Sequence, residues 1–530
     1  MFDNAVEDIN LRKYIPGPGR GSVLITTRDS ELHKHVSARD IALERLGPEI
    51  AAKFFVNELQ REDTSSQIVK DIVFELDGLP IAIAQIAGFI RFSGCSPKKF
   101  LEMYHNRKHS YKLFNDASLP NEDYSYTIQR CVNMSLQILG PEQELLISLL
   151  AFFNTDMIQD SLFREDSLED DVLVKLCGDS YDWNNAKRAL RRHRLVMEID
   201  ESSLWMHRIV KQCILHKLDE DIAKRQHVFR QATLMIKAVF PQRPASGTME
   251  EHVKGECAKW LPHVLSLHKI TVASDPPLDA IIEFADVLTN CGHYLWELGS
   301  EDTSFDLLKD AKIMSENLAE DDIPMPMLAH IYTLLGSMKL YSARDREEGI
   351  SYQEKALEIR HRHWDTCDKA SGEAQTIHLQ LANALNNVGS CLIVQKNYKA
   401  AQGLLEASLE IKTECGTAVT TPYDFAISEY NIGCSLVGQG NPKAAYNHLY
   451  RGWELARKSY SDTNYRVNVF RFAYAQALLQ KDRVQEALTI HEEIRDSRLE
   501  TMGRQNNDTG VSFYALSCVH YDTGDLDLAL

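Results

Sequence analysis

The sequence predicts a mainly α protein that ends in a solenoid of helical hairpins. From about Leu278 to Leu530, a pattern of small residues and leucine returns at offsets of 42 to 44 residues. Upstream of this region, apolar residues recur at helical spacing, and β-rich runs are few and short. We therefore expect a partial α/β region first, helical domains next and the repeat array last.

The repeat is clearest in two stretches that align without a gap, one around Gly389 and one around Gly433. In each, a leucine follows the glycine by three residues and an alanine follows it by twelve. Small side chains at these places are expected where two antiparallel helices approach closely. About six copies share the frame, the others being centred on Gly292, Gly336, Ala475 and Ser517.

Two copies depart from the frame. After Gly336 the twelfth place holds Glu348, which predicts a one-residue insertion in that copy. The last copy is incomplete, because the sequence stops at Leu530 inside the expected second helix, with no polar capping helix. We therefore expect the array to be cut short at this end.

Three asparagines hold the same place in their repeats, two residues before the small residue of the first helix. They are Asn290, Asn387 and Asn431. Asparagine on an inner helix can hydrogen-bond the backbone of an extended peptide, so these residues are the predicted partner-binding positions. The alternative is that they bridge neighbouring helices.

Composition and charge exclude several classes of protein. The 530 residues carry a formal net charge of −18, which disfavours broad binding to nucleic acid or to anionic membranes. No apolar run is long enough to span a bilayer, and no signal peptide is visible, so we expect a cytoplasmic protein. The 11 cysteines are scattered singly, which indicates free thiols.

The amino-terminal region contains two β-rich segments and then helices. Phe2-Asp3-Asn4-Ala5 has the character of a buried strand with a carboxylate at its end, and Ser22–Arg28 is a second buried strand of a parallel sheet. The pattern is helical from Ile41 to His105, and 106–122 is a plausible linker. Asp77-Gly78-Leu79-Pro80 predicts the end of one helix and the start of the next.

The segment from Tyr124 to Lys217 is predicted to be a compact helical domain with one hairpin. Leu195–Ile199 and Ser203–Met206 flank the turn at 200–202, which gives the outline of a winged helix. The basic helix Ala186–His193 could enter a DNA major groove. Alternatively, its cations pair within the protein, with acids such as Glu165, Glu169, Asp170 and Asp171.

Four motifs stand in a suggestive order: Phe2-Asp3-Asn4-Ala5, Thr26-Thr27-Arg28, Gly78-Leu79-Pro80 and Met206-His207-Arg208. They resemble the latter part of the NB-ARC module of STAND-class nucleotide switches. The repeats resemble tetratricopeptide repeats of the kinesin-light-chain type. Together with the winged-helix outline, these features are most similar to those of fungal NLR-like proteins.

The resemblance implies a site for ADP or ATP with Mg²⁺. Asp3 would bind the magnesium, Arg28 would sense the terminal phosphate and Pro80 would pack on the adenine. His207 would contact the β-phosphate of ADP and hold the closed state. Without the resemblance, these residues could equally be a strand cap, a surface ion pair, a helix start and a polar residue of a first helical turn.

Two departures from the family pattern limit this expectation. Arg208 stands where the family usually has an acid, and the sequence contains no Gly-x-x-x-x-Gly-Lys-Ser/Thr phosphate loop. This chain alone is therefore expected to bind ADP or ATP weakly or not at all, and not to be an enzyme.

These observations predict five regions. They are a piece of an NB-ARC α/β domain (1–40), a helical domain (41–118), a winged-helix-like domain (119–218), connecting helices (219–275) and the repeat array (276–530). The predicted function is a signalling receptor fragment, in which the repeats bind a protein or peptide and a nucleotide module switches conformation, with possible homo-oligomer formation on activation. The alternatives are a repeat scaffold without nucleotide function and a winged-helix DNA-binding regulator.

Overall fold

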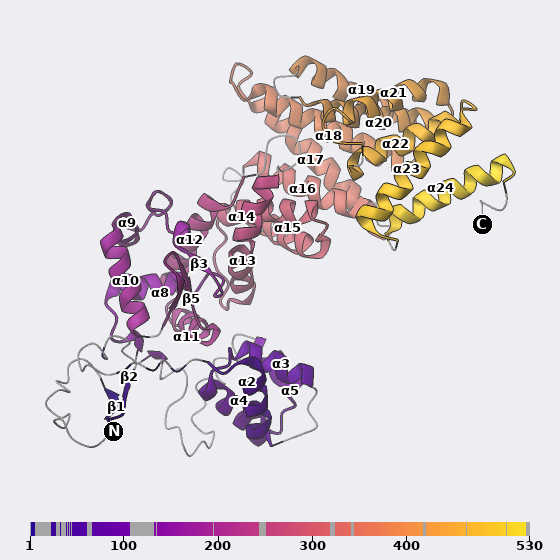
Figure 1. Ribbon diagram of the computed structural model, residues 1–530. Coiled ribbons are helices and arrows are strands. Elements are labelled where there is room, and N and C mark those ends of the chain that lie inside the picture. The colour runs from indigo at the N-terminus through magenta and orange to yellow at the C-terminus, as the bar shows by residue number, and fades with distance from the viewer. Residues whose placement is uncertain are drawn as a thin grey trace. The chain divides into compact units, whose positions relative to one another are not determined.

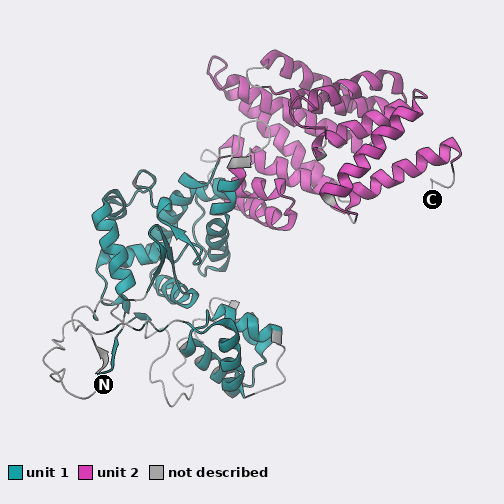
Figure 2. Cartoon of the chain, viewed as in Figure 1, with its two compact units in different colours: residues 1–241, 255–287 teal, residues 242–254, 288–530 magenta. Residues whose placement is uncertain are grey.

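A computed structural model describes most of the chain. The described residues are 2–5, 23–27, 32, 39, 41, 43, 45–60, 66–105, 132–133, 135–193, 195–242, 251–318, 324–340, 344–416, 420–462, 464–504 and 506–525. The chain divides into two compact units (Figure 2). Unit 1 comprises residues 1–241 and 255–287, and unit 2 comprises residues 242–254 and 288–530. The division therefore falls after the boundary expected at residue 276.

Unit 1 begins with the predicted parallel strands. Strand β1 (Phe2–Ala5) pairs in parallel with β2 (Ile25–Thr27), which is shorter than the expected strand over 22–28. The predicted helices follow, and they are α2 (Pro48–Leu59), α3 (Ser66–Glu75), α4 (Pro80–Ser93) and α5 (Pro97–His105). Both α2 and α4 begin at a proline, whose fixed φ suits the first helical turn and whose missing N–H costs nothing there.

The second part of unit 1 combines helices with a small antiparallel sheet, whose strand order is β3-β5-β4. The predicted hairpin is confirmed, since β4 (Met197–Asp200) pairs with β5 (Ser203–Trp205) across the turn. The other elements of this part are α8 (Pro141–Leu150), β3 (Ile158–Gln159), the 3₁₀ turns η2 (Asp160–Leu162) and η3 (Glu165–Ser167), α9 (Asp171–Gly178), α10 (Ser180–Arg192), α11 (Arg208–Asp219) and α12 (Ile222–Val239).

One helix is longer than the sequence indicated. In the region of connecting helices expected at 219–275, the pattern around Trp260 indicates only a short helix, whereas α13 extends from Glu251 to Ala273. Pro262 lies inside it. A proline removes one backbone donor and strains the preceding turn, yet here the helix continues on both sides, so the proline is not a boundary.

Unit 2 is the predicted array of antiparallel helical hairpins (Figure 1). Successive helices in the chain pack on one another, so each hairpin stacks on the next. The helices are α14 (Ile282–Glu297), in which the division between the units falls, α15 (Glu301–Glu316), α16 (Met325–Leu340), α17 (Arg346–Thr366), α18 (Ala374–Val394), α19 (Tyr398–Cys415), α20 (Pro422–Gly438), α21 (Pro442–Ala456), α22 (Tyr465–Leu479), α23 (Val484–Met502) and α24 (Asn507–Thr523).

The repeated glycines stand where two helices of a hairpin meet, as the sequence predicted. A Cβ built at Gly433 would lie 2.6 Å from the side chain of Leu449, and one at Gly389 would lie 2.8 Å from that of Leu405. Both leucines belong to one core cluster together with Ala401 and Ala445. The small residue therefore sets how closely the second helix packs on the first.

The expected insertion is present in the hairpin of α16 and α17. A Cβ at Gly336 would lie 2.9 Å from the carbonyl oxygen of Gly349, and one at Gly349 would lie 3.0 Å from that of Gly336. Gly349 therefore takes the place of the small residue, one position after Glu348. Across the described residues, no helix combines the length and the apolar character needed to cross a membrane.

Candidate switch site and partner surface

The turn between α3 and α4 has a backbone that requires glycine. Asp77 and Gly78 both have positive φ, of 53° and 67°. The amide of Leu46 donates to the carbonyl of Gly78 over 3.0 Å, and a Cβ at Gly78 would collide with the carbonyl oxygen of Leu46. Glycine supplies this conformation without steric cost, so the turn presents Asp77 from a fixed position.

Asp77 joins this turn to the end of the β4–β5 hairpin. Its carboxylate accepts from Nδ1 of His207 over 2.8 Å and pairs with Arg45 over 2.5 Å. The side chains of Asp77 and His207 are 12% and 11% exposed, so water screens their contact little. Burial by itself would raise the pKa of Asp77, but the bond to His207 and the charges of His207, Arg45 and Arg208 hold it below its usual value.

Two arginine–aromatic contacts lie beside the bond between Asp77 and His207. In one, the arginine comes from the first part of unit 1, and in the other it comes from the second part. The guanidinium of Arg45 lies 4.9 Å from the ring centre of Trp205, and that of Arg208 lies 3.8 Å from the ring centre of Phe74. Arg208 also donates to the carbonyl of Phe74 over 3.3 Å. The two parts of unit 1 thus each supply one arginine and one aromatic ring. We call the six residues the latch: Arg45, Phe74, Asp77, Trp205, His207 and Arg208.

Two of the four predicted nucleotide contacts belong to the segments that the latch joins. Pro80 opens α4, three residues after Asp77, and His207 is held by Asp77. The backbone of Asp3 lies in β1, next to β2, but its side chain is outside the described part of the structure. Arg28 lies outside the described residues altogether.

Sequence reasoning missed the partners of His207. Asp77 stands in the motif that was interpreted as a helix stop, and Arg45 stands outside any motif. The sequence signal for Asp77 was its place directly before Gly78-Leu79-Pro80. The residue after His207 departs from the family's acid, and the structure shows an acid reaching His207 from 130 positions away in the sequence.

The basic helix α10 pairs within the protein, although not with the acids expected. Lys187 is 4% exposed and pairs with Asp160 over 2.6 Å, and Arg191 pairs with Glu198 over 2.8 Å. Two of the acids named from the sequence serve elsewhere. Glu169 pairs with Arg230 over 2.7 Å, and the carboxylate of Asp170 caps α9. Two cations of α10, Lys187 and Arg191, therefore have partners within unit 1.

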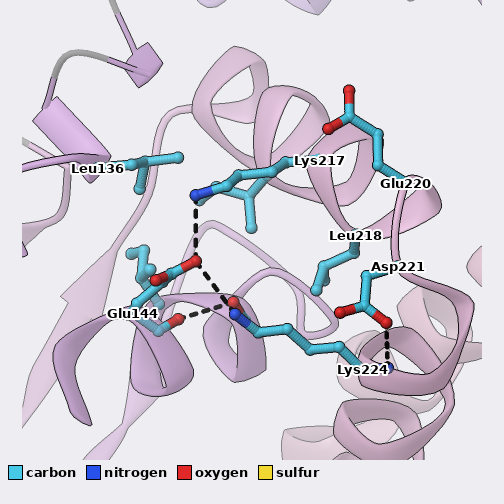
Figure 3. A pocket seen from close by; sticks show the side chains of 10 residues that line it. Leu136, Glu144, Lys217, Leu218, Glu220, Asp221 and Lys224 are labelled. Atoms are coloured by element: carbon cyan, nitrogen blue, oxygen red, sulfur yellow. Dashed lines mark hydrogen bonds and ion pairs between the residues drawn. The ribbon is translucent and has the colours of Figure 1, made fainter. Parts of the chain in front are cut away.

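A small pocket lies between α8, α11 and α12, with Leu136 at its edge (Figure 3). Its volume is about 210 Å³. Lys217 and Lys224 converge on one oxygen of Glu144, each over 3.0 Å. Burial raises the pKa of Glu144, but the two lysines outweigh it and lower that pKa. Because both ammonium groups already pair with Glu144, and Glu220 and Asp221 also line the pocket, we assign it no anionic ligand.

Two of the predicted partner-binding asparagines bridge neighbouring segments, which is the alternative that the sequence left open. Asn431 is 8% exposed and donates to Oδ1 of Asn386 over 3.2 Å. Asn290 is 4% exposed and donates to Oε1 of Gln242 over 3.1 Å. Asn387 is half-buried. Of the three, Asn387 remains the position best placed to contact a partner.

A comparison with protein families gives one match, to a domain of unknown function named DUF7779, over residues 134–222. This stretch holds α8 to α11, the three-stranded sheet and three latch residues, Trp205, His207 and Arg208. The comparison with curated proteins gives no match.

Several solved structures are similar to the chain at low identity. A STAND protein with a tetratricopeptide repeat sensor from Pyrococcus horikoshii is 12% identical, with 91% of this chain and 70% of that chain covered and a TM-score of 0.34. A putative kinesin light chain of Podospora anserina, with nearly identical TPR-like repeats, is 15% identical over 41% of this chain and 96% of its own, with a TM-score of 0.26. The apo form of RapI is 15% identical over 50% and 87%, with a TM-score of 0.35. At these TM-scores, the likenesses decide nothing about function.

Proposed function

We propose that this chain is part of an NLR-like signalling receptor. In this proposal the repeat array binds a protein or peptide partner, and the region around the latch changes conformation with bound ADP or ATP. Nucleotide then acts as a conformational ligand, because it shifts an equilibrium between two states by binding one of them more tightly.

The single observation that carries the proposal is the hydrogen bond between Asp77 and His207. It links the turn before Pro80 to the hairpin end, and these belong to two of the four motifs that the family resemblance assigns to nucleotide. The two residues stand 130 positions apart in the sequence and meet in the folded chain. Both side chains are largely buried, so each needs a polar partner. A phosphate oxygen could take the place of Asp77 as the partner of His207.

The described residues fit a phosphate at one position. Nδ1 of His207 is held by Asp77, and among the described residues Nε2 has no hydrogen-bond partner. A carboxylate that accepts from Nδ1 fixes the ring orientation and favours a proton on Nε2 when the imidazole is charged. His207 would then donate to a phosphate oxygen, and Pro80 would offer an apolar surface to the base. Asp3 would hold the Mg²⁺, and Arg28 would bind the terminal phosphate.

Calorimetry with ADP and Mg²⁺ tests this proposal. This chain alone is expected to give little or no binding heat, because the sequence carries no phosphate loop. A chain in which a segment with such a loop is joined ahead of Met1 is expected to bind, and His207→Ala is expected to weaken that binding by about ten-fold, which corresponds to the loss of one charge-assisted hydrogen bond. Absence of binding in the longer chain would refute the switch.

The array itself favours a second function that survives such a result, a repeat scaffold without a nucleotide. The observation is that Gly389 and Gly433 make the same close contact in successive hairpins, so the surface is a regular stack. Regular stacks of this kind present extended surfaces to partners. If the chain binds its partner at full affinity without binding any nucleotide, the scaffold function is favoured over the switch.

A further inference from the structure

The first hairpins of the array contain a buried hydrogen-bonded chain of three titratable side chains. His293 on α14 and His330 on α16 are 9% and 6% exposed, and the side chain of Glu297 is 5% exposed. Nε2 of His330 lies 3.2 Å from Nδ1 of His293, and Nε2 of His293 lies 3.3 Å from Oε1 of Glu297. We call these three residues the histidine relay.

The relay limits how many protons the two imidazoles can hold. An ionised Glu297 only accepts, so Nε2 of His293 carries a hydrogen. If His293 is neutral, its Nδ1 accepts from Nε2 of His330. If His293 is charged, its Nδ1 donates to Nε2 of His330, which is then unprotonated at that nitrogen. The bond between the rings therefore exists with one or no extra proton.

A second extra proton breaks the bond. Both rings would then carry a hydrogen at each nitrogen, and two N–H groups would point at each other across 3.2 Å. Two positive charges would also lie side by side in a buried place, where water screens them little. Each imidazole takes a proton near pH 6.5 in the unfolded chain, so acid favours a state in which the rings separate.

Several other charged groups on these helices have partners of their own. On α14, Glu283 and Asp286 pair with Arg230 and Lys237. On α15, Lys312 pairs with Glu316, and on α16, Lys339 pairs with Glu348. Oε1 of Glu297 contacts Nε2 of His293, so its negative charge lies on the side of that ring opposite His330.

We propose that the histidine relay is an acid-sensitive clamp between α14 and α16. With at most one extra proton it ties the first helices of two successive hairpins. With a second proton it releases them, which loosens the part of α14 that also carries the predicted partner position Asn290. The clamp involves neither nucleotide nor the latch, so it stands or falls independently of the proposed switch.

Hydrogen exchange of the full chain, followed by mass spectrometry between pH 7.5 and 5, tests the clamp. After correction for the intrinsic pH dependence of exchange, peptides from 288–297 and 325–340 are expected to open more as the pH falls. One extra proton bound by the open state gives up to about ten-fold more opening for each pH unit below about 6. No such rise in the wild-type chain would overturn the proposal.

His330→Gln is the decisive variant. The glutamine amide can donate to Nδ1 of His293 from about the same place, but it does not titrate. The variant is expected to keep its protection from exchange at pH 7.5. It is also expected to lose the acid step, which is the rise in opening below about pH 6. His361→Gln is the matched control, since His361 is an exposed histidine of α17, and it is expected to keep the step. A step that persists unchanged in His330→Gln would overturn the clamp.

Glu297→Gln keeps the inference testable if His330→Gln does not fold. The glutamine oxygen can still accept from His293, but the negative charge that favours protons on the rings is gone. The acid step is therefore expected to move to lower pH, with protection at pH 7.5 retained. An unmoved midpoint would contradict the role assigned to Glu297 and with it the clamp.

Discussion

The repeat array and the latch hold their helices together by opposite means. In the array, Gly433 lets Leu449 pack against the backbone of the neighbouring helix, and apolar contact is dominant. In the latch, a carboxylate, a histidine and two arginines meet between parts of unit 1. Apolar packing depends little on salt or pH, whereas charged contacts depend on both. A response to salt and pH is therefore expected at the latch and at the titratable side chains buried in the array, such as His293, His330 and Lys412, and persistence is expected elsewhere in the array.

The largest effect is expected where the array packs most tightly. Leu449→Ala removes a side chain that is 3% exposed and leaves a cavity against Gly433. Such a loss should cost about 3 kcal/mol of the free energy of unfolding. Val437→Ala on the facing helix is the control, because Val437 is 47% exposed and should change stability by less than about 0.5 kcal/mol. Equal effects in urea denaturation would contradict the packing described here.

A buried lysine in the array adds a pH dependence of unusual sign. Lys412 is 1% exposed, and its Nζ donates to the carbonyl of Asp424 over 3.1 Å and to Ser428 over 2.9 Å. Burial lowers its pKa from 10.5 to about 8, and the charge of Asp424 opposes this only in part. Above about pH 8 the folded chain releases a proton that the unfolded chain keeps until about pH 10.5. The contribution of Lys412 to stability therefore rises with pH in this window.

Lys412→Met should remove that rise. Between pH 8 and 10, the wild-type chain should gain about 2 kcal/mol relative to the variant. At pH 7 the variant should be at least as stable as the wild type, because a buried charge is replaced by an apolar side chain of similar length. Thermal unfolding at several pH values measures both effects, and parallel curves for the two chains would refute the assigned burial of the ammonium group.

The latch should respond to charge with a smaller effect. Asp77→Asn removes the negative charge shared by Arg45 and His207 and should cost about 1 kcal/mol, reduced by the exposure of Arg45. Because the pKa of Asp77 is lowered on folding, its stabilisation is present above its unfolded pKa of about 3.9 and is lost as the pH falls through the folded value. Hydrogen exchange at 72–80 and 203–210 reports the opening. Asp71→Asn on α3 is the charge-matched control.

The smallest expected effect is a difference in stability between alanine variants of two asparagines that hold the same place in their repeats. Asn431→Ala removes a buried bridge to Asn386 and should cost about 1 kcal/mol, whereas Asn387→Ala at its half-buried position should cost less than about 0.5 kcal/mol. If both changes weaken a peptide partner and neither lowers the melting temperature, Asn431 faces a groove after all, and its bridge is dispensable.

The sequence predicted what depends on local pattern and missed what depends on distant side chains. The frame around Gly389 and Gly433 predicted the hairpins, because a close helix contact demands small residues at fixed spacing. The insertion after Gly336 followed from the same rule. Nothing local announces that Asp77 meets His207, or that Lys187 pairs with Asp160, since those pairs are decided when whole elements pack.

Two motif residues of the candidate site could be predicted from the sequence, whereas the residues that contact them could not. Pro80 and His207 were predicted because a family resemblance named them, and the structure places their two motifs next to each other. The contact of Arg45 with Trp205 was not predicted, because arginine–aromatic contacts between distant residues follow no fixed spacing in the sequence. Asp3 and Arg28 remain predictions, as do the nucleotide and the partner.

The turn at Gly78 has a consequence for how this protein can diverge. Its positive φ and the nearby carbonyl of Leu46 forbid any side chain at position 78. At Gly47, the residue after Leu46, an added Cβ would meet nothing within 4 Å. In a saturation library selected for folding, position 78 should return almost solely glycine codons, and position 47 should return many residues. Related genes should show the same asymmetry, which makes Gly78 a fixed reference point for aligning sequences that otherwise share little.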